Sequence, residues 1–252
     1  MSTIRHFTPA FRRTVFAAVG LALAFFLTPL ARSGVLPEAA QEIITGTADW
    51  RDPATAVSPP DDAVGRAVHG FFLARFREVQ DVADRQPPPE MFRAAAKPLA
   101  ETTPGFYDAS LIGPDFVIRQ VYDRMDGLAV GYDLKKVKPL REFWRMMREQ
   151  PGPQLSEPAR GMPWEPRLTT LRVPFFTPDG KLAGIVSLIF RTSALVQTAG
   201  LESCPAWRIT CRGQPAESQG TLPETGTRRV TLRLPATEWV IDYVPAASKK
   251  QD

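Results

Sequence analysis

Histidine and cysteine are both scarce in this chain of 252 residues, which contains only two of each. One histidine, His6, lies near the N-terminus, and the other, His69, follows Val68 in a stretch with helical spacing. A catalytic triad or a histidine-based metal site is hard to build from one such residue. The glycines are scattered at turns and form no phosphate-binding loop. We therefore expect no catalytic centre, no bound metal and no cofactor, and we expect that the protein is not an enzyme.

Acidic residues are absent from the first 33 positions, and this absence explains the charge of the chain. The sequence pI is about 9.3 and the net charge is +4, values that suggest nucleic-acid binding. However, Arg5, Arg12, Arg13 and Arg32 all lie in this segment and account for the whole excess. The remainder of the chain is neutral overall, so we expect no nucleic acid among its partners.

An uncharged apolar run, TVFAAVGLALAFFLTPLA, occupies residues 14–31. It fits a retained membrane anchor whose basic end stays in the cytoplasm, and it also fits a cleaved signal peptide. Pro29 and the modest length favour cleavage, with Ala31-Arg32-Ser33 as the candidate cleavage site, whereas the lack of a clean small-x-small site favours retention. We favour an anchor over residues 1–33, in a single-pass inner-membrane protein with its C-terminal domain in the periplasm. The alternative is secretion to the periplasm after cleavage.

Export would place the two cysteines in an oxidising compartment. Cys204 and Cys211 stand in the segment CPAWRITC, and thiols in an oxidising compartment usually pair. The sequence therefore predicts a disulfide between them. The alternative, a two-thiol metal or redox site, would usually need further cysteine or histidine ligands.

Helical periodicity begins after a proline-containing tether at residues 34–60. Asp61 and Asp62 are suited to a helix start, and Pro88 stops the continuation. Between them, apolar residues recur at steps of three and four, at Val64, Val68, Phe72, Phe76, Val79 and Ala83. This spacing predicts a helix of about 25 residues, close to 40 Å long. A second, shorter helix is expected over residues 90–101.

Two β-hairpins are predicted after these helices. Residues 116–122 and 128–132 have the pattern of strands joined by a turn at Asp126-Gly127. The segments LTTLRVPFF and KLAGIVSLIF have the pattern of a second pair, joined around residues 177–180.

An amphipathic helix is expected between the hairpins, and further strands follow them. Pro139 introduces LREFWRMMREQ, whose apolar residues share one helical face: Leu140, Phe143, Trp144 and Met147. The segment TSALVQTAG predicts another helix. Short strands are expected at residues 207–211, 230–234 and 239–244. This order predicts an α+β fold with a long N-terminal helix, antiparallel sheet units and covering helices, over residues 61–245, with a tail at 246–252.

The order and spacing of four segments carry a resemblance to a known family. They are IRQVYDRMDGLAVGYDL, PLREFWRMMREQPGPQLSEPARG, RVPFFTPDGKLAGIVSLIF and VTLRLPATEWVIDYVP. Together they resemble the CHASE family of extracytoplasmic sensor domains, which occur on bacterial and plant receptors. The similarity extends over most of residues 61–245.

The resemblance implies a PAS-like sheet with a small ligand bound between the sheet and its covering helix or loops. It also implies signalling, and its long membrane-proximal helix implies a homodimer. Family members usually carry a second membrane helix and a cytoplasmic output domain, whereas no apolar run of membrane length follows residue 31 here. We therefore expect the signal to pass through a membrane partner or the N-terminal helix. The alternative is an interaction scaffold with a degenerate sensor fold.

Asp133 is the sharpest candidate for a ligand contact. The resemblance places it at a position where an acidic residue accepts hydrogen bonds from the ligand. A carboxylate between apolar walls suits a ligand that is cationic or bears N–H groups. The alternative is that Asp133 caps a helix or closes a turn.

Four other residues join Asp133 as candidates. Leu155 matches a loop position that faces the ligand in the family, although it is equally suited to the core. Thr170 shares a strand face with Arg172, and we expect Thr170 to point inward and Arg172 to lie at an edge or on a solvated face. Tyr122 and Tyr132 are candidates for an aromatic wall, although core packing also explains them.

Overall fold

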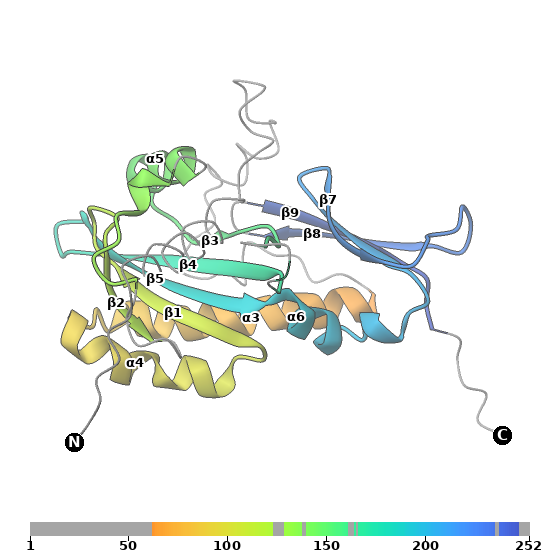
Figure 1. The fold of residues 1–252 in the computed structure, drawn as a ribbon, viewed down its shortest axis with the longest axis horizontal. Helices are drawn as coiled ribbons and strands as arrows, with labels where there is room; N and C mark the ends of the chain where they lie inside the picture. Colours follow the sequence, from red (N-terminus) through yellow and green to blue (C-terminus); the bar gives the residue numbers. More distant parts are fainter. Residues whose placement is uncertain are drawn as a thin grey trace, which may run out of the picture.

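The computed structural model describes residues 62–122, 129–137, 140–160, 164, 166–234 and 237–246. It contains two antiparallel sheets and a long helix, α3 (Ala63–Asp84), that runs beneath both (Figure 1). The predicted α+β fold is confirmed. None of the helices in these ranges is both long and apolar enough to cross a membrane. The predicted anchor and tether lie outside the described residues, as does nearly all of the tail.

Helix α3 begins where the sequence predicts, because Asp62 caps it. One carboxylate oxygen of Asp62 accepts hydrogen bonds from the backbone N–H groups of Val64 and Gly65, at 2.9 and 3.1 Å. The other accepts a hydrogen bond of 2.6 Å from the hydroxyl of Tyr243, near the end of the last strand. The start of the first described helix is thus fastened to the C-terminal strand. The second predicted helix is α4 (Pro89–Thr102), which starts with a proline.

The environment of Asp62 also sets its ionisation. Burial alone would raise the pKa of this carboxyl group, but the hydrogen bonds from Tyr243, Gly65 and Val64 outweigh it. Arg228 lies 3.8 Å away and acts in the same direction. The pKa of Asp62 is therefore held below its ordinary value.

The first sheet has five strands in the order β2-β1-β5-β4-β3, and all neighbours are antiparallel. Its strands are β1 (Phe106–Ile112), β2 (Ile118–Tyr122), β3 (Gln154–Leu155), β4 (Leu168–Phe176) and β5 (Leu182–Arg191). Strands β4 and β5 form the second predicted hairpin. Gly180 takes a φ of +80° in its turn, a conformation that glycine adopts without steric cost.

The second sheet has four strands in the order β7-β6-β9-β8. Its strands are β6 (Trp207–Cys211), β7 (Gln214–Gln219), β8 (Arg228–Leu234) and β9 (Thr237–Tyr243). Helix α6 (Thr192–Thr198) and the short 3₁₀ helix η5 (Leu201–Ser203) connect it to the first sheet. Asp242 on β9 accepts hydrogen bonds from Arg208 and Arg229 on the two neighbouring strands. The bond from Arg229 contributes most to keeping the pKa of Asp242 low.

A single hydrophobic core joins α3 to both sheets. The ring of Phe72 on α3 lies 6.4 Å from that of Phe190 on β5 and 5.1 Å from that of Trp239 on β9, measured between centroids. Phe71 adds an edge contact with Phe190 at 5.3 Å. The two sheets are therefore held as one unit by the same helix.

The opposite face of the first sheet is covered by α5 (Arg141–Glu149) and the 3₁₀ helix η3 (Leu134–Lys136), as Figure 1 shows for α5. The predicted apolar face of α5 is confirmed for Leu140, Trp144 and Met147, which are buried in a second, smaller core cluster. The side chain of Phe143 lies outside the described part of the structure.

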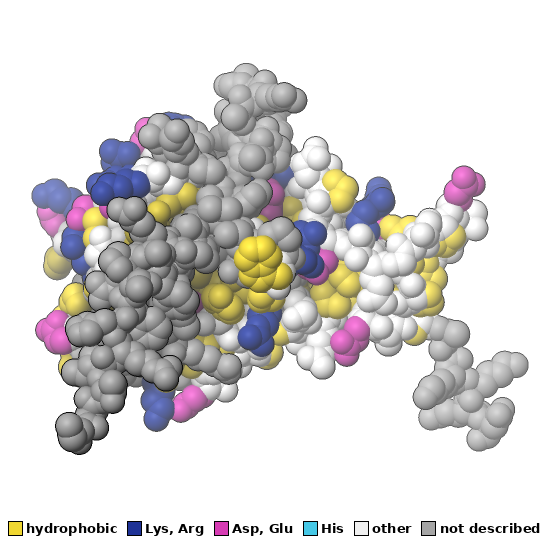
Figure 2. Space-filling view, viewed as in Figure 1, with side chains coloured by type: hydrophobic (Ala, Val, Ile, Leu, Met, Phe, Trp, Pro, Cys, Tyr) yellow, Lys and Arg dark blue, Asp and Glu magenta, His cyan; other side chains and the backbone are white. Residues whose placement is uncertain are grey.

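Charges of both signs are interspersed over the visible face of the molecule (Figure 2). Several pair locally, as in Arg119 with Asp115 at 2.6 Å and Lys181 with Asp179 at 2.7 Å.

The first predicted hairpin is wrong in one of its strands. Strand β2 is present, but its partner is β1, which the sequence analysis missed. Residues 129–131 form a turn in which Gly131 has a φ of +83°. This turn still lies beside β2, because the N–H of Gly131 donates to the carbonyl of Ile118 at 2.8 Å. The predicted turn at Asp126-Gly127 lies outside the described residues.

The predicted disulfide is also wrong, since Cys204 and Cys211 are both free and buried. Cys204 precedes β6 and Cys211 is its last residue. Strand β6 alone spans about 13 Å at the usual rise, whereas disulfides join Cα atoms at most about 7 Å apart. Burial raises the pKa of the Cys211 thiol, which keeps it protonated.

We predict that Asp62→Ala lowers the free energy of unfolding by about 1 kcal/mol or more, because the helix cap and the Tyr243 bond are both lost. Since the folded pKa of Asp62 is lowered, this contribution is complete at neutral pH. It is lost as the pH falls below about 4 and through the folded pKa. Urea unfolding curves at several pH values measure the difference.

Two matched variants separate the contributions of Asp62. Asp62→Asn retains a capping oxygen, and Tyr243→Phe removes only the hydroxyl donor, so each should cost less than Asp62→Ala. An Asp62→Ala protein as stable as the wild type at pH 7 would contradict the assignment.

Candidate ligand-binding face

Five polar side chains are buried on the face of the first sheet that α5 covers. None is more than 7% exposed. We call this set the polar face: Ser110, Gln154, Thr170, Arg172 and Ser187. Polar groups seldom occupy the interior of a sheet unless they bind one another or another molecule.

The strand register brings these side chains together. Gln154 lies opposite Arg172, Arg172 opposite Ser187, and Ser187 opposite Ser110, so four strands contribute to one row. Directly opposite residues of antiparallel strands project to the same face, with Cβ atoms about 5 Å apart. Thr170 lies two residues before Arg172 on β4 and therefore projects to that face as well.

Arg172 provides the charge of the polar face. Its side chain is 1% exposed, and its guanidinium carbon lies 5.5 Å from the ring centre of Trp144 on α5. Trp144 in turn stacks on Phe116, at 4.9 Å between ring centroids. Burial lowers the pKa of Arg172 to about 9, so the side chain remains positively charged at neutral pH.

Two buried side-chain oxygens of the polar face have no hydrogen-bond partner among the described residues. They are Oγ1 of Thr170 and Oε1 of Gln154. The backbone of Thr170 is fully engaged, because its N–H donates to Ser156 Oγ at 2.7 Å and its carbonyl accepts from the N–H of Ser156 at 2.8 Å. A buried oxygen left without a partner costs about 1–3 kcal/mol.

Thr170 points inward as the sequence predicts, whereas the exposed position predicted for Arg172 is wrong. Strand β4 is not an edge strand, since β5 and β3 flank it. Residues 168–174 are all buried, because α3 packs on one face of the strand and Trp144 of α5 contacts the other. A solvated position for Arg172 would require one of these faces to be open.

Asp133 and Tyr132 lie beside the polar face, toward the β2 edge of the sheet. Asp133 caps η3 by accepting a 3.0 Å hydrogen bond from the N–H of Lys135, and it forms a β-bridge with Val117. Tyr132 is half-buried against the core cluster beneath α5. Asp133 pairs with Val117 just before β2, whereas Arg172 and Thr170 are on β4, three strand spacings or about 14 Å away. Asp133 therefore has a structural role, and its contact with a ligand stays a prediction.

Tyr122 and Leu155 project to the other face of the sheet. The ring of Tyr122 lies 6.1 Å from that of Phe106, and the guanidinium of Arg93 on α4 lies over it at 5.5 Å. Leu155 is opposite Leu171 and belongs to the core against α3. The structure thus brings neither residue to the polar face.

Three residues of the polar face were missed by the sequence analysis. Ser187 carries a usable signal, because it is the one hydroxyl within the apolar run GIVSLIF. Ser110 belongs to a strand that was not predicted. Gln154 lies in a two-residue strand between prolines, where no periodic pattern can develop.

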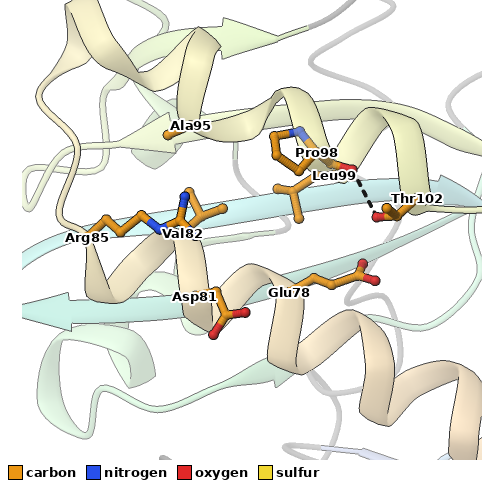
Figure 3. Close-up of a pocket in the computed structure, with 8 residues that line it drawn as sticks. All are labelled: Glu78, Asp81, Val82, Arg85, Ala95, Pro98, Leu99 and Thr102. Atoms are coloured by element: carbon orange, nitrogen blue, oxygen red, sulfur yellow. Dashed lines mark hydrogen bonds between the residues drawn. The ribbon is translucent and has the colours of Figure 1, made fainter.

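A cavity of about 120 Å³ lies between α3 and α4, on the side of the first sheet away from α5 (Figure 3). The close-up shows four lining residues from α3 and its C-cap facing four from α4: Glu78, Asp81, Val82, Arg85, Ala95, Pro98, Leu99 and Thr102. Small-molecule sites usually measure about 300–1,000 Å³. This cavity is too small for such a ligand, and no predicted site residue lines it.

No cluster of three or more metal-ligating side chains occurs within the ranges that the structure describes. The polar face itself contains no carboxylate, thiol or imidazole among its five residues. Its chemistry is that of hydrogen bonding and positive charge.

Solved structures with a similar fold include an extracellular ligand binding receptor and the ligand-binding domains of chemoreceptors. An extracellular ligand binding receptor from Desulfohalobium retbaense matches 72% of this chain at 14% identity with a TM-score of 0.57, and the match spans 39% of that receptor. The ligand-binding domain of the Pseudomonas aeruginosa amino acid chemoreceptor PctC matches 73% of this chain and 94% of its own length, at 14% identity and a TM-score of 0.51. That of the Pseudomonas fluorescens chemoreceptor CtaA matches 75% and 94%, at 13% identity and a TM-score of 0.53.

These similarities establish that the chain has the fold of extracellular ligand-binding sensor domains. No protein-family model and no curated protein matches the sequence. The finer resemblance to the CHASE family therefore rests only on the sequence segments that suggested it.

We predict that Asp133→Ala destabilises the protein by about 1 kcal/mol, because the N–H of Lys135 loses its acceptor. Asp133→Asn keeps an acceptor oxygen and should retain most of this stability. Thermal unfolding of the two variants measures the difference. If Asp133→Asn folds normally but no longer responds to a ligand that stabilises the wild type, the carboxylate contacts that ligand as the sequence predicts. Equal stability of the alanine variant and the wild type would contradict the cap.

Proposed function

We propose that this protein is an extracytoplasmic sensor that binds a small organic ligand on the polar face and passes its state to a membrane signalling partner. The observation that carries the proposal is the row of buried polar side chains, contributed by four strands, beneath α5. A row of this kind gives a ligand hydrogen-bonding groups in a site shielded from water, which is typical of small-molecule sites.

The similar solved structures support amino acids as the class of ligand to consider first. The PctC domain was solved with GABA, and the CtaA domain with L-valine. Both are small amino acids with a carboxylate. Amino acids and related carboxylates are therefore the first compounds to test on this chain.

We expect a ligand-induced shift of the first sheet to be transmitted along α3. This helix packs on β4 and β5 of the first sheet, and it also packs on β8 of the second. Its first residue follows Asp62, which binds Tyr243 at the end of the second sheet. A shift of the first sheet would thus reach the N-terminal end of α3, where the proposed tether and anchor begin. Pairing of two such helices in a homodimer would carry the shift to a partner protein.

The alternative function, an interaction scaffold with a degenerate sensor fold, requires a contiguous exposed apolar patch. Four large apolar side chains are exposed among the described residues: Met91, Tyr107, Val130 and Trp164. The buried polar row beneath α5 supports the sensor instead, because convergent polar groups in a shielded site are typical of small-molecule sites. The sensor is therefore favoured.

We predict that at least one small ligand raises the unfolding temperature of the full chain purified in detergent. The screen should include amino acids, other carboxylates, amines and nucleobases. A ligand at about 100 times its Kd stabilises the native state by about 2.7 kcal/mol. Stabilisation of the wild type that is lost in Trp144→Leu would place the ligand beneath α5. The absence of any shift across the whole screen would refute the sensor function.

We also predict that a C-terminally tagged full chain is found in the membrane fraction after cell lysis. The apolar residues 14–31, if retained, would hold it there. Recovery of the tagged chain in the soluble periplasmic fraction, shortened by about 30 residues, would instead identify a cleaved signal peptide. Sensor function without an anchor would then require a soluble complex with the partner.

A further inference from the structure

We infer that the second sheet can swing away from the first at one end while it stays attached at the other, and that two ion pairs between the sheets control this movement. We call the four residues of these pairs the clasp: Glu157, Arg167, Arg212 and Glu217. This movement belongs to the fold itself and is independent of the proposed function, so it can be tested without a ligand.

One end of the second sheet is attached to the rest of the molecule in two ways. The connection from the first sheet, through α6 and η5, enters the second sheet at Trp207, the first residue of β6. Trp207 lies opposite Tyr243 on β9. The hydroxyl of Tyr243 donates a hydrogen bond of 2.6 Å to Asp62 at the start of α3. The covalent connection and the polar contact thus meet at the same end of the sheet, which makes this end a pivot.

Away from the pivot, the second sheet contacts the first through the clasp. Arg212 follows the last residue of β6, and its Nε lies 3.4 Å from Oε1 of Glu157, a residue of the segment after β3. On β7, Oε1 of Glu217 lies 3.8 Å from Nε of Arg167, the residue before β4. Both ion pairs therefore join the β6–β7 hairpin to the β3–β4 edge of the first sheet.

The clasp holds its charges less firmly than the second sheet holds its own. Burial raises the pKa of Glu157 and of Glu217, and the neighbouring arginines offset this effect only in part. At Asp242, by contrast, the hydrogen bonds from Arg229 and Arg208 outweigh burial, and the pKa is lowered. An ion pair whose attraction does not offset its lost hydration adds little to closure. The second sheet is thus held firmly within itself, and the clasp is where it separates from the first.

Opening at the clasp also has to separate two aromatic rings. Trp239 lies opposite Cys211 on β9, at the end of the sheet away from the pivot, and its ring packs on Phe72 of α3 with 5.1 Å between centroids. Loss of this apolar contact keeps the open form a small fraction of the molecules. A reagent that traps each molecule as it opens is suited to such a minor form.

A buried thiol beside the clasp can report its opening. Cys211 directly precedes Arg212 and is 0% exposed. Burial raises the pKa of this thiol, and the nearby charge of Glu157 acts in the same direction. Cys204 is also buried, but it follows η5 in the connection at the pivot. Movement at the clasp would therefore expose Cys211 and leave Cys204 covered.

The segment after β3 connects the clasp to the polar face. Glu157 follows Ser156, whose hydroxyl oxygen accepts a hydrogen bond of 2.7 Å from the N–H of Thr170. Gln154 of the polar face lies two residues before Ser156. Release of Glu157 would therefore loosen the edge of the polar face, so that movement of the second sheet is felt there.

Charge reversal tests the clasp. Glu157→Arg places a like charge opposite Arg212, and Arg212→Glu places one opposite Glu157, whereas the two changes together restore opposite charges. The same three variants are made in the other ion pair of the clasp. Glu101→Arg is the matched control, because it reverses one partner of an exposed ion pair within α4, where Glu101 lies 3.6 Å from Lys97. If a reversal prevents folding, Arg212→Gln removes the charge without reversing it.

The rate at which a maleimide labels the native full chain in detergent measures the opening. In a Cys204→Ala background, we expect Cys211 to react about tenfold or more faster in each single reversal than without it. In the double swaps its rate should return close to the starting value. In a Cys211→Ala background, Cys204 should keep the same rate in every variant. Glu101→Arg should change neither rate.

Urea unfolding of each variant distinguishes movement of one sheet from unfolding of the whole chain. If both thiols react faster together, in proportion to the lost free energy of unfolding, the sheet does not move separately and the inference is refuted. Unchanged labelling of Cys211 in all the single reversals would refute it as well. Faster labelling that persists in both double swaps would show that the ion pairs do not control the movement.

Discussion

The contact of one α3 side chain with both sheets is the interaction on which the rest of the structure depends. Phe72 packs against Phe190 on one side and Trp239 on the other, so a single ring belongs to the interior of each sheet. The four-stranded sheet alone would expose its apolar face, and the five-stranded sheet would lose part of its cover. Asp62 adds a polar connection at the start of the same helix through its bond to Tyr243. The side of the first sheet that faces α3 is thereby filled by the main hydrophobic core. A ligand would therefore have to bind on the side that faces α5.

That division of labour explains where the polar side chains lie. Odd-numbered residues of β4, such as Leu171 and Val173, join the core against α3. Arg172, between them, projects toward α5 and is neighboured by Ser187 on the next strand. Because strand residues alternate, a sheet can keep an apolar interior on one face and a polar row on the other without a break in either. On that face the guanidinium group of Arg172 packs against the ring of Trp144.

Local patterns predicted the elements that have a helical period or a clear turn signal, and failed where neither was present. The spacing of α3 and its cap at Asp62 were correct, as was the hairpin of β4 and β5. Strand β1 was missed because residues 109–112 are buried in succession, which removes the alternation that marks a strand. Arg172 was expected at the surface because arginine is usually exposed. The sequence does not reveal that β4 is covered on both faces, by α3 and by α5. The disulfide failed for a related reason: it was inferred from the expected compartment, whereas the extended backbone of β6 lies between the two cysteines.

The strand order of the second sheet has a consequence for how copies of the protein meet. Strands β7 and β8 are its edges, and edge strands offer unpaired backbone groups to other chains. The β8 edge carries Arg228, Arg229 and Arg233, whose side chains are 65%, 67% and 67% exposed. Each of these arginines forms an ion pair within the chain, with Asp62, Asp242 and Glu238 respectively, and β7 contains Pro215, which has no N–H to donate. The charged side chains along β8 and the proline in β7 both oppose edge-to-edge pairing of this sheet with a second copy.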